Sequence, residues 1–265
     1  MEGRKKKFIK ELMEKPSLRR ESGLYVVDGP KMCGEIPEEL LEEVFVSEAL
    51  LSSAEQMERL SSLLSRKGYE TVTEREMKQI SDTVTPQGVL ALVRQKRPRG
   101  IGEILGSIEK AGRTGLLILL EGVQDPGNAG TILRSAEAAG ADAVICDRGC
   151  ADVYSPKAVR STMGAVFRMP VLRLEDIFPA VDKLKQSGYE ILAAHLKAKE
   201  DYDRTDLTVP CCILIGNESR GLSDRLSDCA TKLIRIPMEG RTESLNASVA
   251  ASVIMFEAAR QRRYK

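Results

Sequence analysis

The feature that most constrains the fold is a regular alternation of apolar runs and helical patterns in the second half of the chain. The run GLLILLEG at 115–122 is almost entirely apolar, which is typical of a strand buried on both faces. A helical pattern follows over 128–139, and further apolar runs alternate with helical stretches up to a long final helix. Strands that alternate with helices predict an α/β domain with a mainly parallel sheet.

The first hundred residues form a separate pattern. Apolar runs at 23–29, 42–47 and 88–94 predict strands, and residues 53–67 predict an amphipathic helix. The stretch RQKRPRG at 94–100 then interrupts the pattern with four basic residues, a proline and a glycine. We therefore predict a smaller α/β domain over 1–98, a linker over 99–112 and the larger α/β domain over 113–265.

The composition of the chain limits the partners, metal sites and cellular compartment that we expect for it. The formal net charge of +1 points to no class of partner, although balanced totals can hide basic patches. No CxxC pair is present and only one histidine, so the six cysteines predict reduced thiols, no metal site and a cytoplasmic location. The basic N-terminus lacks an apolar run long enough for a signal peptide or a membrane span.

The carboxyl ends of parallel strands are where such sheets bind ligands, so the loops after the strands matter most. In the first loop, Pro126 and Gly127 predict a turn and Asn128 can cap the next helix. Arg134 lies nearly opposite the face that Ile132 defines as buried, within two turns of the helix start. A cation is disfavoured there unless an anion such as an RNA phosphate is near; a solvated surface arginine is the alternative. The loop has neither a P-loop nor a GxGxxG pattern, which disfavours nucleotide-binding enzymes of those types.

Two later loops carry more polar groups than turns require. GNESRGLS at 216–223 follows a strand and places Glu218 at the edge of any site there, although a plain turn is the alternative. In SLNAS at 244–248, one helix cap would need only one of Ser244 and Asn246. The following helix predicts a core line of Val249, Val253 and Phe256. Small residues at 247, 250 and 251 permit close packing, including that of a second subunit.

Taken together and in this order, these three motifs resemble the SpoU/TrmH family of RNA 2′-O-ribose methyltransferases, in the SPOUT superfamily. The matching residues are Asn128, Gly130 and Arg134 in the first motif, then GNESRGLS, then IPM and SLNASVA. The likeness covers roughly 116–260. The first domain, with RRESGLYVVDGPK and TPQGVLALV, is similar to the substrate-binding domain often found ahead of the catalytic one.

The resemblance implies a SPOUT-type parallel sheet with a deep trefoil knot, an S-adenosylmethionine cofactor and a homodimer packed through the catalytic domain. The implied catalytic residues are Arg134, Asn128, Glu218, Ser244 and Asn246. The implied cofactor-binding residues are Ala193, Ala194, His195, Leu214, Gly216, Asn217, Gly221, Ile236, Met238, Leu245 and Ala247.

The roles within that set stay open. The family assigns Arg134 to the 2′-hydroxyl, with help from Ser244 and Asn246. An arginine is effectively always protonated, so Arg134 suits phosphate binding or alkoxide stabilisation better than proton abstraction. His195 is the only histidine and follows a strand, and it could be a base or a residue at the cofactor's edge.

Clustered cations near the N-terminus and before the linker fit the phosphate contacts that dominate RNA affinity. The candidates are Arg4, Lys5, Lys6, Lys7, Arg19, Arg20, Arg94, Lys96 and Arg97. Few aromatic residues are available for base stacking, which favours a structured RNA over a long single strand. We expect a large-subunit (23S) ribosomal RNA substrate. A transfer RNA is the nearest alternative, and a non-catalytic RNA-binding protein of the same fold is a third.

Overall fold

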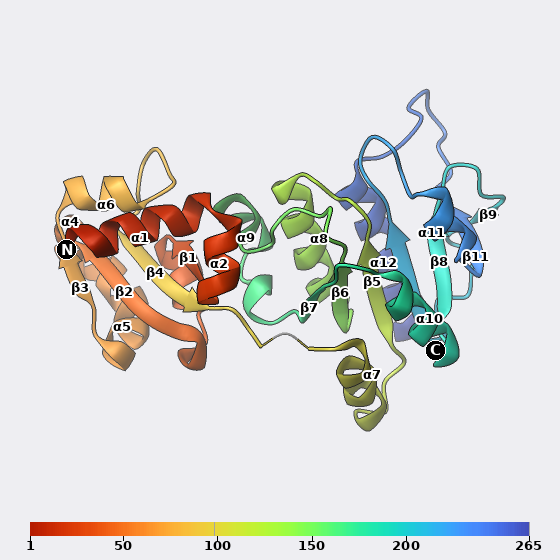
Figure 1. Ribbon diagram of the computed structural model, residues 1–265, viewed down its shortest axis with the longest axis horizontal. Coiled ribbons are helices and arrows are strands. Elements are labelled where there is room, and N and C mark those ends of the chain that lie inside the picture. The colour runs from red at the N-terminus through yellow and green to blue at the C-terminus, as the bar shows by residue number, and fades with distance from the viewer. Residues whose placement is uncertain (98, 265) are drawn as a thin grey trace. The chain divides into compact units, whose positions relative to one another are not determined.

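The computed structural model describes residues 1–97 and 99–264, which divide into two compact units (Figure 1). Unit 1 comprises residues 1–97 together with 152–167, and unit 2 comprises the described residues of 98–151 and 168–265. The sequence-based division assigned 152–167 to the second domain, and the fold instead builds this segment into unit 1. Each unit has its own sheet.

Unit 1 contains a four-stranded sheet in the order β1-β4-β2-β3. Its strands are β1 (Leu24–Asp28), β2 (Leu41–Ser47), β3 (Glu70–Val72) and β4 (Val89–Arg94). β4 pairs antiparallel with β1 and β2, and β2 pairs parallel with β3. The three longer strands are those that the apolar runs predicted.

Helices cover both faces of this sheet, because successive residues of each strand point to opposite sides. They are α1 (Gly3–Glu14), α2 (Pro16–Ser22), α3 (Pro30–Gly34), α4 (Glu48–Leu51), α5 (Ala54–Lys67), α6 (Glu74–Ile80) and α9 (Pro156–Thr162), with 3₁₀ turns at Glu38–Leu40 and Ala165–Phe167. Val26 of β1 packs in one core with α1 and α6, whereas Tyr25 and Val27 pack in the other with α3 and α5.

The segment 152–167 belongs to unit 1 because its apolar side chains complete that second core. Val159, Val166 and Phe167 are each at most 3% exposed and pack in the cluster that contains Tyr25. At the start of the segment, Asp152 accepts a hydrogen bond from the buried Arg19 at 2.8 Å. An apolar pattern predicts that a helix is buried but does not show which core it joins. The sequence could therefore not assign this segment to one of the two units.

Unit 2 contains a seven-stranded sheet in the order β7-β6-β5-β10-β8-β11-β9. Its strands are β5 (Leu116–Leu120), β6 (Ala143–Cys146), β7 (Val171–Arg173), β8 (Glu190–Ala194), β9 (Glu200–Asp201), β10 (Cys211–Ile215) and β11 (Lys232–Arg235). All of the neighbouring strands among these described residues pair in parallel. The predicted α/β fold with a parallel sheet is confirmed.

Helices cover both faces of this sheet as well. They are α7 (Ile101–Lys110), α8 (Pro126–Ala138), α10 (Phe178–Gln186), α11 (Asp224–Asp228) and α12 (Ala247–Arg263). Leu117 and Leu119 of β5 face a core shared with α7, α10 and α11. α12 packs along α8 and also contacts β10. Helix α7 occupies most of the segment that the sequence predicted as a linker.

The interior face of α12 differs from the predicted one. The fully buried residues are Ala251, Ile254, Met255 and Ala258, whereas Val249 and Phe256 are 47% and 49% exposed. The predicted core line was therefore wrong at these two positions. The interior face thus combines two alanines with Ile254 and Met255.

Across residues 1–97 and 99–264, no helix combines the length and the apolarity needed to cross a membrane. In that same part of the chain, no three His, Cys, Asp or Glu side chains gather in a way that could hold a metal ion. All six cysteines are free thiols.

Candidate active site

Three loops at the carboxyl ends of β5, β10 and β11 are joined by a chain of side-chain hydrogen bonds. Asn246 Nδ2 donates to Asn128 Oδ1 at 3.0 Å, and Asn128 Nδ2 donates to Glu218 Oε1 at 2.9 Å. Each of the three residues comes from a different predicted motif. The fold thus brings together residues that lie 90 to 118 positions apart in the sequence.

The first loop frees Asn128 for this contact because another residue caps α8. Asp125 Oδ1 accepts from the main-chain N–H of Asn128 at 2.8 Å, and Pro126 occupies the first helical turn. The expectation that Asn128 caps the helix was therefore wrong. An Asp directly before a Pro is a recognisable helix start, and that signal was present in the sequence.

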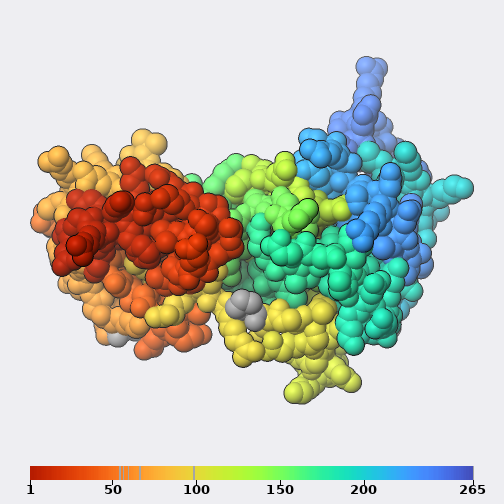
Figure 2. Space-filling view, in the orientation of Figure 1, coloured from red at the N-terminus to blue at the C-terminus, as the bar shows by residue number. Residues whose placement is uncertain are grey.

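In the third loop, the helix cap is Asn246. Its Oδ1 accepts from the main-chain N–H groups of Ser248 at 2.9 Å and Val249 at 3.4 Å. Ser244 does not cap α12 and lines a cavity instead. The two polar residues that seemed redundant for one helix start therefore have separate positions. Figure 2 shows the exposed segment before α12, in deep blue, projecting from the surface.

Glu218 is held ionised by its surroundings. Burial raises its pKa, but a hydrogen bond from the Asn128 side chain and others from the main-chain N–H groups of Gln124 and Asp125 more than offset burial, so the pKa lies below the usual glutamate value. A carboxylate that accepts several hydrogen bonds is stabilised in its ionised form. It is therefore a weak base.

The second loop folds back on itself, and Gly216 and Asn217 make the contacts that allow this. Asn217 and Gly221 exchange main-chain hydrogen bonds at 3.0 and 2.9 Å, and Asn217 Nδ2 donates to the Gly122 carbonyl at 2.7 Å. A Cβ on Gly216 would lie 2.2 Å from the main chain of Gly221 and Leu222. Gly216 is required by this close approach within the loop.

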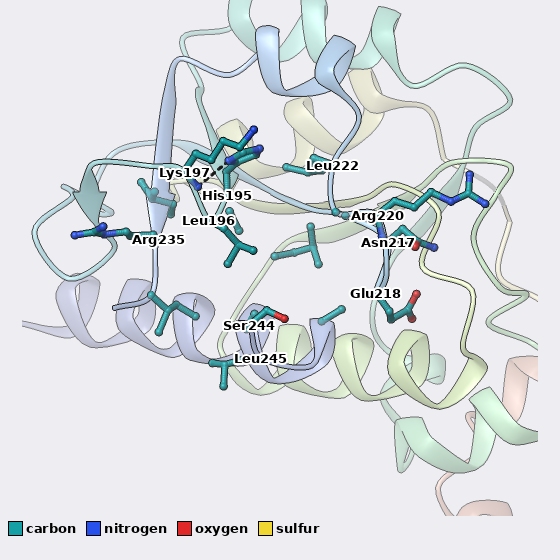
Figure 3. Close-up of a pocket in the computed structure, with 18 of the residues that line it drawn as sticks. His195, Leu196, Lys197, Asn217, Glu218, Arg220, Leu222, Arg235, Ser244 and Leu245 are labelled. Carbon is teal, nitrogen blue, oxygen red and sulfur yellow. Dashed lines mark hydrogen bonds between the residues drawn. The ribbon is translucent and has the colours of Figure 1, made fainter. Parts of the chain in front are cut away.

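Beside the three loops lies a cavity of about 420 Å³ (Figure 3). Predicted residues that line it are Ala194, His195, Gly216, Asn217, Glu218, Gly221, Ile236, Met238, Ser244, Leu245 and Ala247. The predicted cofactor residues Ala193 and Leu214 do not line it, because both are fully buried in the core of unit 2. Asn128, Asn246 and Arg134 are also absent from the lining.

Sequence reasoning missed other lining residues. They are Leu196, Lys197, Ile215, Ser219, Arg220, Leu222, Asp224, Ile234, Arg235, Ala250 and Ile254. Most directly follow or precede a predicted position, so extending each post-strand window by two or three residues would have included them. In Figure 3, Arg220 and Arg235 extend away from the centre of the cavity.

His195 lies at the opposite end of the cavity from Ser244 (Figure 3). Its main-chain N–H donates to the Ile234 carbonyl, and its Nδ1 accepts from the main-chain N–H of Lys197 at 3.1 Å. Because Nδ1 already accepts a hydrogen bond, the neutral ring carries its hydrogen on Nε2. In this arrangement His195 can donate to a ligand but has no free nitrogen to take a proton.

Arg134 lies on the exposed side of α8. Its guanidinium makes no hydrogen bond or ion pair with any other residue within the described ranges 1–97 and 99–264. This exposure fits the prediction that Arg134 points away from the core.

Several predicted RNA contacts in unit 1 are engaged within the protein. Arg19 is only 2% exposed and donates to Asp152 at 2.8 Å and to the carbonyls of Leu12 and Met13. We therefore assign Arg19 a structural role and withdraw it from the candidate RNA contacts. Ion pairs with acidic neighbours also hold Lys5, Lys6 and Arg94. Arg4, Lys7, Arg20, Lys96 and Arg97 are exposed.

Comparison with known proteins agrees with this geometry. The model of the SpoU rRNA Methylase family matches residues 115–256, and that of the MRM3-like substrate binding domain matches residues 4–91. A protein of Staphylococcus epidermidis, named for the TrmH family of tRNA/rRNA methyltransferases, is 37% identical over 176 residues. These residues are 66% of this chain and 71% of that protein.

Several solved structures resemble the whole chain. The SpoU methyltransferase AviRb from Streptomyces viridochromogenes, in complex with the cofactor AdoMet, superposes with a TM-score of 0.84 at 27% identity and covers 99% of both chains. A structure described as an RNA 2′-O ribose methyltransferase superposes with a TM-score of 0.79 at 28% identity, covering 98% of this chain and 97% of the other.

Proposed function

Because the chain belongs to the SpoU rRNA methylase family, we propose that it transfers a methyl group from S-adenosylmethionine to a ribose 2′-hydroxyl of a structured RNA. The observation that carries this proposal is the hydrogen-bonded chain of Asn246, Asn128 and Glu218 at the edge of a cavity. The three residues come from the three motifs that define the resemblance. A relative in complex with AdoMet supports the cofactor.

The cavity fits that cofactor in size and in chemistry. Its volume of about 420 Å³ lies in the range of pockets for small organic ligands. Leu245, Ile236 and Met238 offer apolar surface for the adenine, while the strand ends at Ala194 and Gly216 offer main-chain polar groups. When bound, S-adenosylmethionine supplies a methyl group activated by a positively charged sulfur.

In the reaction, a C–O bond to the ribose oxygen forms while the C–S bond breaks, the sulfonium becomes a neutral thioether and the hydroxyl proton leaves to water. The protein must therefore align the two ligands and stabilise negative charge on the ribose oxygen. Glu218 and His195 are poorly suited to remove the proton, for the reasons given above. We assign Arg134 to an RNA phosphate or to the developing alkoxide, because its exposed guanidinium is a permanent cation.

We propose that unit 1 recognises the RNA and unit 2 carries out the transfer. The match of residues 4–91 to a substrate-binding domain supports this division, and the exposed cations Arg4, Lys7 and Arg20 are candidate phosphate contacts. Large-subunit (23S) ribosomal RNA is the proposed substrate, since the matching family is one of rRNA methylases. Transfer RNA is the second candidate, because the S. epidermidis relative is named for both RNAs.

We further propose a homodimer packed through unit 2, a C-terminal segment threaded as a trefoil knot, and a cytoplasmic location. The exposed apolar side chains of Val249 and Phe256 on α12 support the dimer. The similarity to SpoU methyltransferases supports the knot. The free thiols support a reducing compartment.

Two measurements test this function. Calorimetry should show that S-adenosylmethionine binds the purified protein, and no binding would favour a non-catalytic RNA-binding protein. An Arg134→Ala variant should lose methylation while it still binds S-adenosylmethionine. If Arg134→Ala kept its activity and His195→Ala lost it, the roles proposed for these two residues would be reversed.

A further inference from the structure

Hydrogen-bond partners at both ends of the chain fix the orientations of the Asn246 and Asn128 side-chain amides. At one end, Asn246 Oδ1 accepts from the main-chain N–H groups of Ser248 and Val249, which can only donate. At the other end, Asn128 Nδ2 donates to Glu218, whose ionised carboxylate can only accept. The central contact, from Asn246 Nδ2 to Asn128 Oδ1, agrees with both.

This arrangement determines what the two amides can offer a ligand. Turning either amide over would set two oxygens or two NH₂ groups against each other. Each amide therefore uses its oxygen and one hydrogen inside the protein. A second hydrogen on each Nδ2 has no partner among the hydrogen bonds of residues 1–97 and 99–264.

Ser248 adds a third donor to the Asn246 oxygen. It is 6% exposed, its Oγ donates to Asn246 Oδ1 at 2.7 Å, and the same Oγ lies 3.4 Å from Asn128 Oδ1. Asn246 Oδ1 thus accepts from three protein donors, and Asn128 Oδ1 accepts from Asn246 Nδ2. Since both oxygens already accept from the protein, the groups that the two amides can offer a ligand are the remaining N–H groups of Asn128 and Asn246.

The donors lie beside the place where the reaction would occur. Ser244, Leu245 and Ala247 flank Asn246 in sequence and line the cavity, and so does Glu218, the partner of Asn128. Asn128 and Asn246 do not line the cavity themselves, so a ligand oxygen that meets their free N–H groups must lie beside the cavity, next to these lining residues. Such fixed donors act most strongly on an oxygen that gains negative charge during a reaction.

We propose that Asn128 and Asn246 are paired hydrogen-bond donors to the reacting ribose oxygen, and that Ser248 is a positioning residue that holds their amides in the donating orientation. This proposal rests on the proposed function and deepens it. It assigns the asparagines to charge stabilisation and excludes them as proton acceptors.

The test replaces a donor with an acceptor of the same shape. The Asn246→Asp variant keeps the cap of α12, because aspartate is among the preferred N-cap residues. Single-turnover methylation at saturating RNA and S-adenosylmethionine should fall on the order of 10²- to 10³-fold in Asn246→Asp, as for loss of an oxyanion donor. The fall should exceed that in Asn246→Ala, with the dissociation constants of both ligands unchanged.

Two results would overturn the assignment. A rate for Asn246→Asp equal to or above that of Asn246→Ala would show that no donor is needed. A change confined to RNA affinity would place the donors on a phosphate instead of the reacting oxygen. Failure of the proposed function itself would look different, because the unaltered protein would then form no 2′-O-methyl product.

The positioning role of Ser248 has its own control one turn along α12. Ser248→Ala should lower the single-turnover rate about tenfold without changing either dissociation constant, and Ser248→Thr should restore it. Ser252 Oγ lies 2.7 Å from both Ser135 Oγ and the Ser248 carbonyl oxygen but has no hydrogen bond to either amide. It is the matched site, and Ser252→Ala should keep the full rate. Equal rates for the two alanine variants would contradict a positioning role.

Discussion

Asn246 Nδ2 donates a 3.0 Å hydrogen bond to Asn128 Oδ1 across 118 residues of sequence. The contact joins the start of α12 to the first turn of α8, and these two helices pack along each other in unit 2. It therefore links two of the three motifs that carry the resemblance to SpoU methyltransferases.

The first prediction concerns the strength of this link. In a double-mutant cycle of Asn128→Ala and Asn246→Ala, the coupling in the free energy of unfolding should be about 0.5–1.5 kcal/mol, the usual value of one hydrogen bond. Urea denaturation measures it. As a control, Gln261→Ala at the far end of α12 should be additive with Asn128→Ala, because the two side chains share no contact. Additivity in the Asn128–Asn246 cycle would contradict the contact.

The second prediction concerns the pH dependence that Glu218 confers. Its pKa in the folded protein lies below the unfolded value, so the ionised carboxylate stabilises the fold above about pH 4.3, and this contribution is lost as the pH falls through the folded pKa. The free energy of unfolding of the wild type should therefore approach that of Glu218→Gln on acidification. The same substitution at the exposed Glu239 serves as the surface control. A wild-type advantage that grew in acid would have the wrong sign.

The third prediction separates a structural arginine from a surface one. Arg19→Ala should destabilise the protein by about 3 kcal/mol, because it leaves Asp152 and two main-chain carbonyls without their cation. Arg20→Ala, at the exposed neighbouring position, should stay within about 0.5 kcal/mol of the wild type. Thermal unfolding and RNA titration of both variants measure this. A stable Arg19→Ala protein with weakened RNA binding would restore Arg19 as an RNA contact.

The fourth prediction concerns the exposed apolar side chains of α12. Phe256→Glu should convert a dimer to a monomer in sedimentation experiments, because a charge would be buried in an apolar interface. Val84→Glu changes an equally apolar, fully exposed position in unit 1 and should leave the dimer intact. A monomeric wild type, or a dimer that survives Phe256→Glu, would exclude this interface.

Much of the fold follows from the sequence because buried parallel strands have a simple signature. The run at 115–122 and the others like it correspond to β5, β6, β7, β8, β10 and β11. Helices α1 and α2 were not predicted, since their segments are rich in charge and only part of each is buried. The two-residue strand β9 offers no pattern at all.

The sequence predicted many of the residues that line the cavity, but not the separate positions of its polar side chains. Ser244 and Glu218 line the cavity, because polar residues after strands gather at one edge of a parallel sheet. The cap of α12 could not be chosen between Ser244 and Asn246, since both side chains can accept from a helix N-terminus. The sequence also did not reveal that Val249 is exposed, because a helix with apolar residues on two faces does not indicate which face is interior.

The most direct test of the central claim is the chemical identity of the product. Purified protein is incubated with S-adenosylmethionine carrying a labelled methyl group and with 23S ribosomal RNA or transfer RNA, and the nucleosides are then analysed by mass spectrometry. We predict that the label appears on a ribose 2′-oxygen at one site in the ribosomal RNA, and that Asn246→Asp slows its appearance on the order of 10²- to 10³-fold. Label on a nucleobase, or no label in either RNA, would contradict the account.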